Sequence, residues 1–304
     1  MKILQSSWQD KEGITFHAQS WEPDARPTAV VALLHGLGEH IARYAVFAEA
    51  LVKAGYAVIG FDLRGHGRSG GRRGHTPSYE ALLDDIDTLL VRVKGRYPRQ
   101  PVFLYGHSLG GALAINYVLR RAPRIQGVIA TAPWLRTVIE APPLKAALAR
   151  ILEPILPTYT ERWAQEPTEL SQDPAVASAF ARDPLRHNLI SARMYRACTQ
   201  AGEWALEHAA EFRLPLLLMH GTADSLTSWE ASQEFARRLG RKVTWRLWDG
   251  WYHELHNEPE RRRVVQTIIA WMNRKLENRR SARPPAGQMR PGMRKSRPIL
   301  NPGA

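Results

Sequence analysis

Gly106-His107-Ser108-Leu109-Gly110-Gly111 is the stretch that decides the fold of this chain, because it places a serine between glycines directly after the apolar run from Val102 to Tyr105. The pattern is G-x-S-x-G, in which a strand reverses at once into a helix. This reversal strains the backbone of the serine, and only small flanking residues leave room for it. The sequence therefore predicts an open Ser108 hydroxyl at a strand-to-helix turn, with a plain glycine-rich turn as the alternative.

Apolar, β-branched segments alternate with helical patterns along most of the chain. Their near-continuous apolar character indicates a parallel sheet with helices on both faces, so the predicted fold class is α/β. Antiparallel strands are expected at the start, around 14–21. We expect strands at 29–34, 57–61, 102–105, 128–132, 214–219 and 243–248, and helices at 45–54, 79–97, 110–121, 230–239 and 258–276.

The alternation stops between Trp134 and Arg213, where helical patterns and prolines occur without a convincing strand. We interpret residues 135–212 as a helical cap inserted into a sheet domain formed by 1–134 and 213–277. One helical face of this cap is apolar. This apolar face either packs on the domain below or lines an acyl-chain tunnel. It consists of Leu144, Leu148, Ile151, Leu152 and Ile155, followed by Tyr159 and Trp163.

The basic charge of the chain is concentrated at its end. The formal net charge is +13, but residues 278–304 hold seven basic residues and no acidic ones, which leaves 35 basic against 29 acidic residues and a net charge of +6 elsewhere. This tail is rich in proline and has little apolar surface to bury, so we expect it to be disordered. The tail is either a solvated extension or a segment that weakly attracts RNA or acidic lipid.

The composition favours a cytoplasmic protein that stands at most peripherally at a membrane. No run of apolar residues approaches the length of about 18 that spans a bilayer, and the first residues do not resemble a signal peptide. Cys198 is the single cysteine, which excludes an intramolecular disulfide and a cysteine-built metal site. Neither the oligomeric state nor a role for Cys198 follows from the sequence.

Two later loops supply partners for Ser108. A serine hydroxyl needs a histidine to take its proton, and that histidine needs an orienting carboxylate. Asp224 follows the strand expected at 214–219, and His253 follows the strand expected at 243–248. Both loops lie at the carboxyl edge of the sheet, so we predict Ser108 as nucleophile, His253 as base and Asp224 as orienting acid. Asp249 is the weaker alternative for the orienting acid, and His256 is the weaker alternative for the base.

Two backbone amides are the candidates for binding an oxyanion. Leu109 directly follows the serine, at the positive end of the predicted helix. The loop His35-Gly36-Leu37-Gly38-Glu39-His40 follows the first buried strand, and its glycines let the backbone approach a substrate. We predict the amides of Leu37 and Leu109 as the donors.

Two other motifs suggest a cofactor or a metal but do not fit. The stretch Gly65 to Gly70 has the spacing G-x-G-x-x-G, yet a loop rather than a helix follows it. The stretch His253-Glu254-Leu255-His256 is one residue shorter than the zinc pattern H-E-x-x-H, so its histidines would not stand one helical turn apart. We therefore expect neither a cofactor nor a metal.

Five motifs in this order resemble the α/β-hydrolases of the monoacylglycerol lipase and lysophospholipase group, which are related to the serine aminopeptidase-like hydrolases. The likeness extends from about Trp8 to Trp271. It implies a mostly parallel eight-stranded sheet with helices on both faces, an inserted helical cap over an apolar tunnel, and hydrolysis of single-chain acyl esters. In that group the acid loop often continues with Asp and Val, whereas here it reads Asp224-Ser225-Leu226-Thr227. The motifs are 35–40, 62–70, 106–111, 221–224 and 253–258.

These residues predict a serine esterase that acts on monoacylglycerols, lysophospholipids or similar small acyl esters through an acyl-enzyme. A peptidase or amidase with the same three residues is the first alternative. A non-catalytic protein that binds acyl ligands under the cap is the second.

Overall fold

A mostly parallel sheet of eight strands organises the chain. The computed structural model describes residues 1–138, 154–163 and 166–281. The strand order in the sheet is β1-β2-β4-β3-β5-β6-β9-β10. The strands are β1 (Lys2–Gln9), β2 (Thr15–Glu22), β3 (Ala29–Leu34), β4 (Tyr56–Phe61), β5 (Val102–His107), β6 (Gly127–Thr131), β9 (Leu216–Gly221) and β10 (Val243–Trp248).

Strand direction follows the expectation from the sequence. β2 pairs antiparallel with both β1 and β4. The other neighbours in this sheet pair in parallel, in the order β4, β3, β5, β6, β9 and β10. Every residue of β3, β5, β6 and β9 is buried, because helices cover both faces of these central strands. The predicted α/β-hydrolase fold is therefore confirmed.

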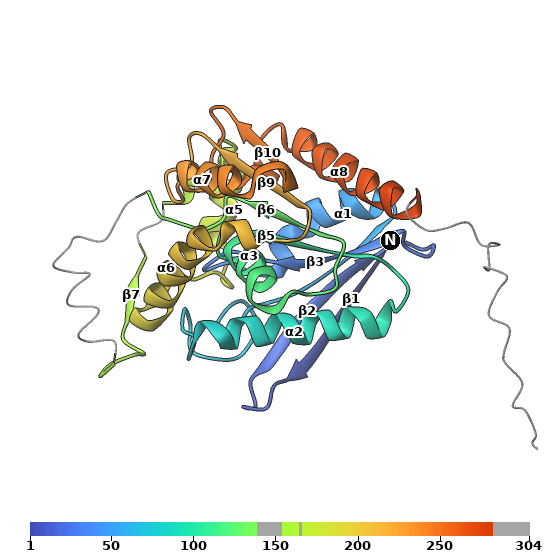
Figure 1. Ribbon diagram of the computed structural model, residues 1–304. Coiled ribbons are helices and arrows are strands. Elements are labelled where there is room, and N and C mark those ends of the chain that lie inside the picture. The colour runs from blue at the N-terminus through green and yellow to red at the C-terminus, as the bar shows by residue number, and fades with distance from the viewer. Residues whose placement is uncertain (139–153, 164–165, 282–304) are drawn as a thin grey trace, which may run out of the picture.

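The core lies in two layers, one on each side of the sheet. One apolar layer packs α1 (Ala45–Lys53) and α8 (Arg261–Ser281) on the sheet, and the other packs α2 (Tyr79–Arg96), α3 (Leu109–Arg121), α6 (Ala192–Glu207) and α7 (Trp229–Leu239). In Figure 1, α2 and α3 lie on the near side of the strands and α1 lies on the far side. The central strands thus have no solvent-facing side, and their carboxyl ends remain the accessible edge for chemistry.

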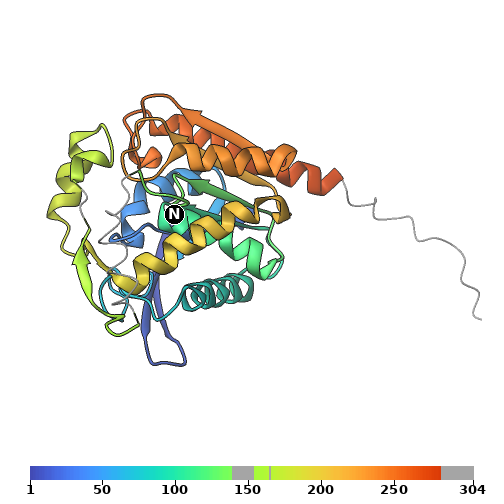
Figure 2. The same cartoon turned by 60° about the vertical axis from the view of Figure 1, so that its left-hand side comes forward.

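The segment from 135 to 212 adds no strand to this sheet in its described residues. It contains α5 (Pro174–Arg182), α6 and a two-stranded antiparallel ladder of β7 (Thr160–Arg162) and β8 (Leu189–Ser191). Figure 2 shows the yellow-green part of the segment standing apart from the main sheet. The sequence pattern predicts no strand here, and this prediction is wrong for β7 and β8, because three residues are too few to display a period of two.

Two predicted features fall largely outside the described residues. Of the apolar face expected in the cap, Leu144, Leu148, Ile151 and Leu152 lie outside them, and Ile155 is 71% exposed. The last helix extends beyond its predicted end and reaches Ser281, so the first residues of the predicted tail are helical. The rest of that tail, 282–304, also lies outside the described residues.

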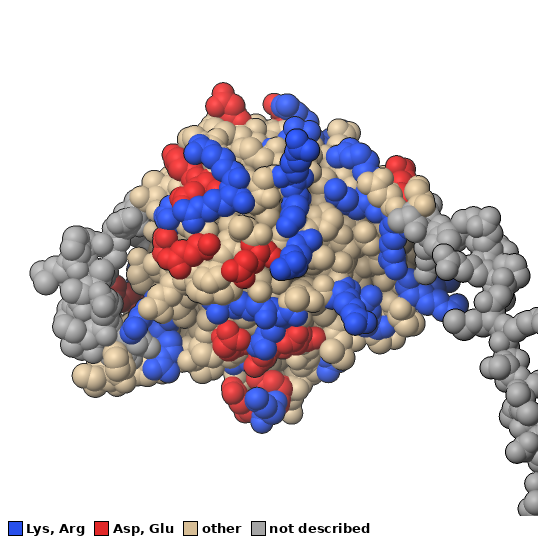
Figure 3. All heavy atoms as spheres, viewed as in Figure 1, with Lys and Arg blue, Asp and Glu red and all other residues tan. Residues whose placement is uncertain are grey.

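The surface of the described residues carries both signs of charge. Figure 3 shows Lys and Arg side chains spread over one face with Asp and Glu side chains among them. Within the described residues, no helix is both long and apolar enough to cross a membrane.

Candidate active site

Ser108 lies at the turn between β5 and α3, in a backbone conformation that side chains rarely adopt. Its φ is 53° and its ψ is −117°. Its backbone amide donates to the Thr131 carbonyl over 2.9 Å, and its carbonyl accepts from Trp134 over 3.0 Å. Hydrogen bonds on both sides therefore hold the strained turn, and the serine is 9% exposed.

The glycines around Ser108 are required by close approaches between backbones. A Cβ on Gly106 would lie 2.1 Å from the Gly110 carbonyl oxygen, and a Cβ on Gly110 would lie 2.3 Å from the carbonyl oxygen of Leu34 at the end of β3. These contacts exclude any larger residue at either position. They also press the start of α3 against the end of β3, which brings Ser108 beside the loop that follows β3.

Asp224 and His253 come together from the loops after β9 and β10. The Nδ1 atom of His253 donates to the Oδ2 atom of Asp224 over 2.7 Å. Ser108 and His253 line the same cavity. The structure thus brings the three predicted residues to one edge of the sheet, as the order of their strands implied.

Burial and charge act in opposite directions on this pair. Burial alone would raise the pKa of the Asp224 carboxyl, but the facing His253 and hydrogen bonds from His220 and His253 hold that pKa well below its usual range. Burial lowers the pKa of His253, and the Asp224 carboxylate raises it by more, so the pKa of His253 ends above its usual value of 6.5. The pair is therefore arranged to stabilise a protonated imidazole.

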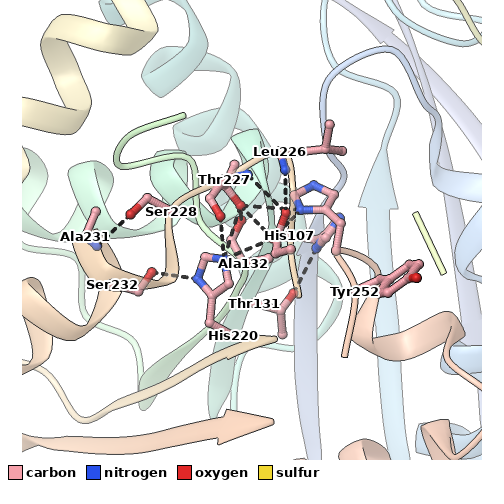
Figure 4. Close-up of polar contacts among 12 residues, drawn as sticks. His107, Thr131, Ala132, His220, Leu226, Thr227, Ser228, Ala231, Ser232 and Tyr252 are labelled. Carbon is pink, nitrogen blue, oxygen red and sulfur yellow. Dashed lines mark hydrogen bonds and ion pairs between the residues drawn. The ribbon is translucent and has the colours of Figure 1, made fainter. Parts of the chain in front are cut away.

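His220 and Thr227 hold the carboxylate of Asp224, and the sequence analysis assigned no role to either. The Nε2 atom of His220 donates to Oδ2 over 3.0 Å, and the Thr227 hydroxyl donates to the same oxygen over 2.9 Å. The amides of Leu226 and Thr227 donate to Oδ1. Figure 4 shows His220, Leu226 and Thr227 converging on this point, with Ser232 behind His220. Every oxygen of the buried carboxylate is thus satisfied.

The two alternative residues point to other partners. Asp249 accepts a hydrogen bond from the Thr222 hydroxyl over 3.1 Å, at the exposed start of the loop after β10. His256 is buried with its ring stacked on Tyr44 at 4.7 Å, and neither ring nitrogen has a hydrogen-bond partner among the described residues. Burial lowers the pKa of His256 to about 4. The geometry therefore favours Asp224 over Asp249 and His253 over His256.

The loop after β3 lies directly against the serine. A Cβ on Gly36 would lie 3.2 Å from the Cβ of Ser108, and Leu37 lines the cavity together with the serine. The amide of Leu109 starts α3 beside Ser108, as expected. The amide of Gly36 donates to the Glu39 carboxylate, which fixes the loop from within.

Arg43 joins this loop to the loop of His253. Its guanidinium donates to Glu39 over 2.6 Å and makes two hydrogen bonds, of 2.7 and 2.9 Å, to Glu254. The same guanidinium lies 4.6 Å above the ring of Phe180 in α5. Burial would raise the pKa of Glu254, but Arg43 lowers it to about 2. One buried cation thus links the candidate oxyanion loop, the histidine loop and the inserted segment.

The cavity at Ser108 is small and largely apolar. Its volume is about 30 Å³. Six apolar side chains belong to its wall. They are Leu37, Trp134, Trp163, Leu170, Phe180 and Leu226.

The two stretches whose spacing suggested a cofactor or a metal make other contacts in the structure. Between Gly65 and Gly70 the backbone forms a loop that Asp62 holds through the amides of Ile41 and Arg68. His253 pairs with Asp224, whereas His256 stacks on Tyr44. Among the described residues no group of three or more His, Cys, Asp or Glu side chains is placed to hold a metal ion. The loop from 62 to 70 thus supports the turn after β3.

Comparisons with known proteins identify relatives of this chain. Over residues 25–260 the chain matches the family described as serine aminopeptidase, S33. It is 37% identical over 278 residues to an abhydrolase domain-containing protein of Dictyostelium discoideum, covering 90% of this chain and 29% of that longer protein. It is 31% identical over 262 residues to a monoacylglycerol lipase of Mycolicibacterium smegmatis, covering 86% of this chain and 93% of that protein.

A solved structure shows a similar fold. The crystal structure of the Paleococcus ferrophilus monoacylglycerol lipase superposes with a TM-score of 0.79 at 33% identity, covering 86% of this chain and 99% of that one. The chain belongs to the serine aminopeptidase S33 family, as an α/β-hydrolase of the monoacylglycerol lipase group.

Proposed function

We propose that the protein hydrolyses carboxylic esters of single-chain lipids, of the monoacylglycerol or lysophospholipid type, through an acyl-enzyme. The observation that carries the proposal is the 2.7 Å hydrogen bond between His253 and Asp224 at the rim of an apolar cavity that Ser108 also lines. Its relatives are named monoacylglycerol lipases, so the chain is an enzyme of the carboxylic ester hydrolase class.

Each candidate residue has one role in the proposed reaction. The Ser108 Oγ attacks the ester carbonyl while His253 Nε2 takes its proton, and Asp224 stabilises the imidazolium through Nδ1. The carbonyl oxygen becomes an oxyanion, which the amides of Leu37 and Leu109 stabilise. His253 then returns the proton to the departing alcohol, and a water molecule repeats the sequence to release the fatty acid.

Aromatic side chains form one wall of the cavity that would bind the acyl chain. Trp134, Trp163 and Tyr195 form a cluster with ring centroids 5.4 to 6.2 Å apart, and both tryptophans line the cavity. Burying methylene groups against such rings contributes about 0.8 kcal/mol each. We therefore propose that residues 135–212 act as a cap whose inner face binds the acyl chain.

The experiment that tests the proposal is Ser108→Ala. We expect this variant to fold and to lose at least about 10³-fold of its turnover of a p-nitrophenyl ester. Labelling by a fluorophosphonate should require both Ser108 and His253. Hydrolysis by Ser108→Ala at the parent rate would exclude Ser108 as the nucleophile, and labelling without turnover of any ester would favour the acyl-binding alternative.

An amidase with the same residues is the second candidate, because the matched family is described as a serine aminopeptidase. Matched ester and amide substrates with the same acyl chain separate the two. A kcat/KM for the amide as high as for the ester would favour the peptidase, and a panel of monoacylglycerols and lysophospholipids would then define the head group.

For the basic end of the chain we propose weak electrostatic attraction to anionic lipid or RNA, in a cytoplasmic protein that contacts membranes only peripherally. The support is its charge, with seven basic and no acidic residues in 278–304. Equal binding to anionic vesicles and to RNA with and without these residues would exclude this attraction.

A further inference from the structure

Helix α8 runs antiparallel along the edge strand β10, and Figure 1 shows the two elements side by side. The Trp271 indole donates to the Thr244 hydroxyl over 3.1 Å near the start of β10. The guanidinium of Arg263 lies 5.4 Å from the centre of the Trp248 ring at the end of β10. From 263 to 271 a helix rises about 12 Å, and from 244 to 248 a strand rises about 13 Å, so the two elements stay in register between these contacts.

Five exposed basic residues lie along this pair of elements, and we call them the β10–α8 surface. Arg246 stands in the middle of β10, on the face of the strand that makes both contacts with α8. Arg263 and Arg274 are about three helical turns apart and therefore share one face of α8. Arg241 and Lys242 directly precede β10, which places them towards the end of the antiparallel α8.

The acidic residues nearby do not balance this charge. Residues 241–279 include nine basic and five acidic residues. Glu254 and Glu258 are buried and accept hydrogen bonds inside the protein, which leaves three exposed acids. Glu260 pairs with Arg263 over 2.9 Å. The side chains of the other four residues of the surface have neither an ion pair nor a hydrogen bond among the described residues.

Figure 3 agrees with this count. A row of Lys and Arg side chains crosses the part of the molecule where Figure 1 shows β10 and α8. Such a concentration of one sign on one edge attracts an extended anionic partner.

Apolar side chains stand at the carboxyl end of β10, beside the basic ones. Trp248 and Trp251 are half-buried and contact each other with ring centroids 4.6 Å apart. Leu247 is 37% exposed at the same edge of the sheet. Indole and leucine side chains next to basic residues are typical of surfaces that lie at a lipid interface. Nucleic acid would stack bases on the indoles but would gain little from the leucine.

We propose that the β10–α8 surface docks the protein on a membrane that contains anionic lipid. The negative surface potential of such a membrane attracts Lys and Arg side chains near it. The loop of His253 directly follows β10, so this docking holds the candidate active site close to the membrane that contains a lipid ester. The choice of lipid as partner rests on the proposed hydrolysis of lipid esters.

The test is binding of the full-length protein to vesicles of phosphatidylcholine with and without phosphatidylserine, measured by co-sedimentation. We expect binding only when phosphatidylserine is present, and weaker binding as the salt concentration rises. The double variant Arg246→Gln, Arg274→Gln should bind about thirtyfold more weakly, which corresponds to about 1 kcal/mol for each arginine. The basic tail is intact in every variant, so a difference reports the folded surface.

The matched control is the double variant Lys94→Gln, Arg99→Gln. Both residues are exposed, at the end of α2 and just after it, and α2 packs on the other side of the sheet from α8. Their side chains have no ion pair among the described residues. This control removes the same charge and should bind the vesicles as the parent does. Arg241→Gln, Lys242→Gln is a second variant of the surface if the first does not fold.

Turnover separates this proposal from the proposed function. Both double variants should hydrolyse a soluble p-nitrophenyl ester at the parent rate. Arg246→Gln, Arg274→Gln should lose turnover of a monoacylglycerol that is carried in phosphatidylserine vesicles, in proportion to its weaker binding. Vesicle binding by a parent protein that hydrolyses neither ester would support the docking and overturn the proposed hydrolysis.

Three results would overturn the docking proposal. The first is no binding of the parent to phosphatidylserine vesicles, and the second is equal weakening of that binding by the two double variants. The third is binding of an oligoribonucleotide that Arg246→Gln, Arg274→Gln weakens while vesicle binding stays unchanged, which would identify nucleic acid as the partner.

Discussion

The backbone amide of His187 donates a 2.9 Å hydrogen bond to the carbonyl of Gly38. Gly38 directly follows Leu37, whose amide is a candidate oxyanion donor, while His187 belongs to the inserted segment. A second contact lies beside the first, because His40 Nε2 donates to the Asp183 carboxylate over 2.6 Å. The insertion thus helps to fix the loop that would stabilise the oxyanion.

Replacing Gly38 by alanine should lower turnover by disturbing this loop. Gly38 has a φ of +75°, and a Cβ there would lie 2.1 Å from the His187 carbonyl oxygen, so the backbone of one segment must shift. A shift of about 1 Å in a catalytic group can lower a rate about 10²-fold. We expect kcat for a short p-nitrophenyl ester to fall by that factor, while KM changes little.

Gly13→Ala is the matched control for this variant. Gly13 has a φ of +80°, but a Cβ there meets nothing within 4 Å. Both variants carry the same conformational cost of about 1 kcal/mol, so Gly13→Ala should lose stability and keep its kcat. Equal activity of the two variants would show that the contact with His187 does not matter for turnover.

The pH dependence of turnover should reflect the raised pKa of His253. The imidazole accepts a proton only when it is neutral, and Asp224 holds its pKa above 6.5. The acid limb of kcat/KM against pH should therefore have its midpoint above pH 6.5. Asp224→Asn should move that midpoint to lower pH and reduce kcat by about 10⁴-fold. An acid limb at the same pH in Asp224→Asn would exclude Asp224 as the partner of His253.

Arg43→Met should destabilise the fold strongly. The change leaves Glu39 and Glu254 buried, 3% and 2% exposed, without their shared cation. Breaking a buried ion pair costs about 3 to 5 kcal/mol, which urea unfolding would detect. Lys53→Met breaks an exposed pair with Glu49 of the same helical spacing and should have little effect. A stability loss as small as that of Lys53→Met would mean that the network is not structural.

Through the pKa of Glu254, Arg43 should also affect how the stability of the fold depends on pH in acid. Its pKa of about 2 in the folded protein is below the usual 4.5, so its ionised form stabilises the fold above pH 4.5 and this contribution is lost as the pH falls towards 2. In Arg43→Met the pKa of Glu254 should rise towards or above 4.5, so Glu254 contributes less stability above pH 4.5 and less is lost as the pH falls. Urea midpoints between pH 7 and pH 3 measure the difference.

His256→Phe should make the protein less sensitive to mild acid. The buried His256 protonates only near pH 4, whereas in the unfolded chain it protonates near pH 6.5, so unfolding takes up a proton between these values and stability falls. Its ring nitrogens have no hydrogen-bond partner among the described residues, so phenylalanine should fit against Tyr44 at little cost. A urea midpoint that declines between pH 7 and pH 5 as steeply as in the parent would contradict this.

The buried strands could be predicted from the sequence because they are short apolar runs with clear ends. The buried strand β3 has the predicted bounds, and so does β10, which is a partly exposed edge strand. Asp224 and His253 could be found because each follows a strand that the sequence predicts. β7 and β8 were missed because strands of three residues show no period, and their pairing depends on the rest of the insertion.

The residues around the candidate site were harder to find than the site itself. Arg43 and Glu254 are 211 residues apart, and no local pattern indicates that they meet. His220 precedes Asp224 by four residues, but its hydrogen bond depends on the turn that the loop after β9 makes. Sequence patterns define the elements, whereas such contacts depend on how distant loops are packed against each other.

A second glycine, Gly74, makes the same kind of contact with the insertion as Gly38 does. These contacts limit which segments of the protein can be exchanged with those of a relative. The Ser191 amide donates to the Gly74 carbonyl over 2.8 Å, and a Cβ on Gly74 would lie 2.0 Å from the carbonyl oxygen of Leu189. The insertion is therefore fitted to two loops of the domain that surrounds it. A chimaera that exchanges residues 135–212 with those of a relative should work only when the loops around Gly38 and Gly74 are exchanged as well.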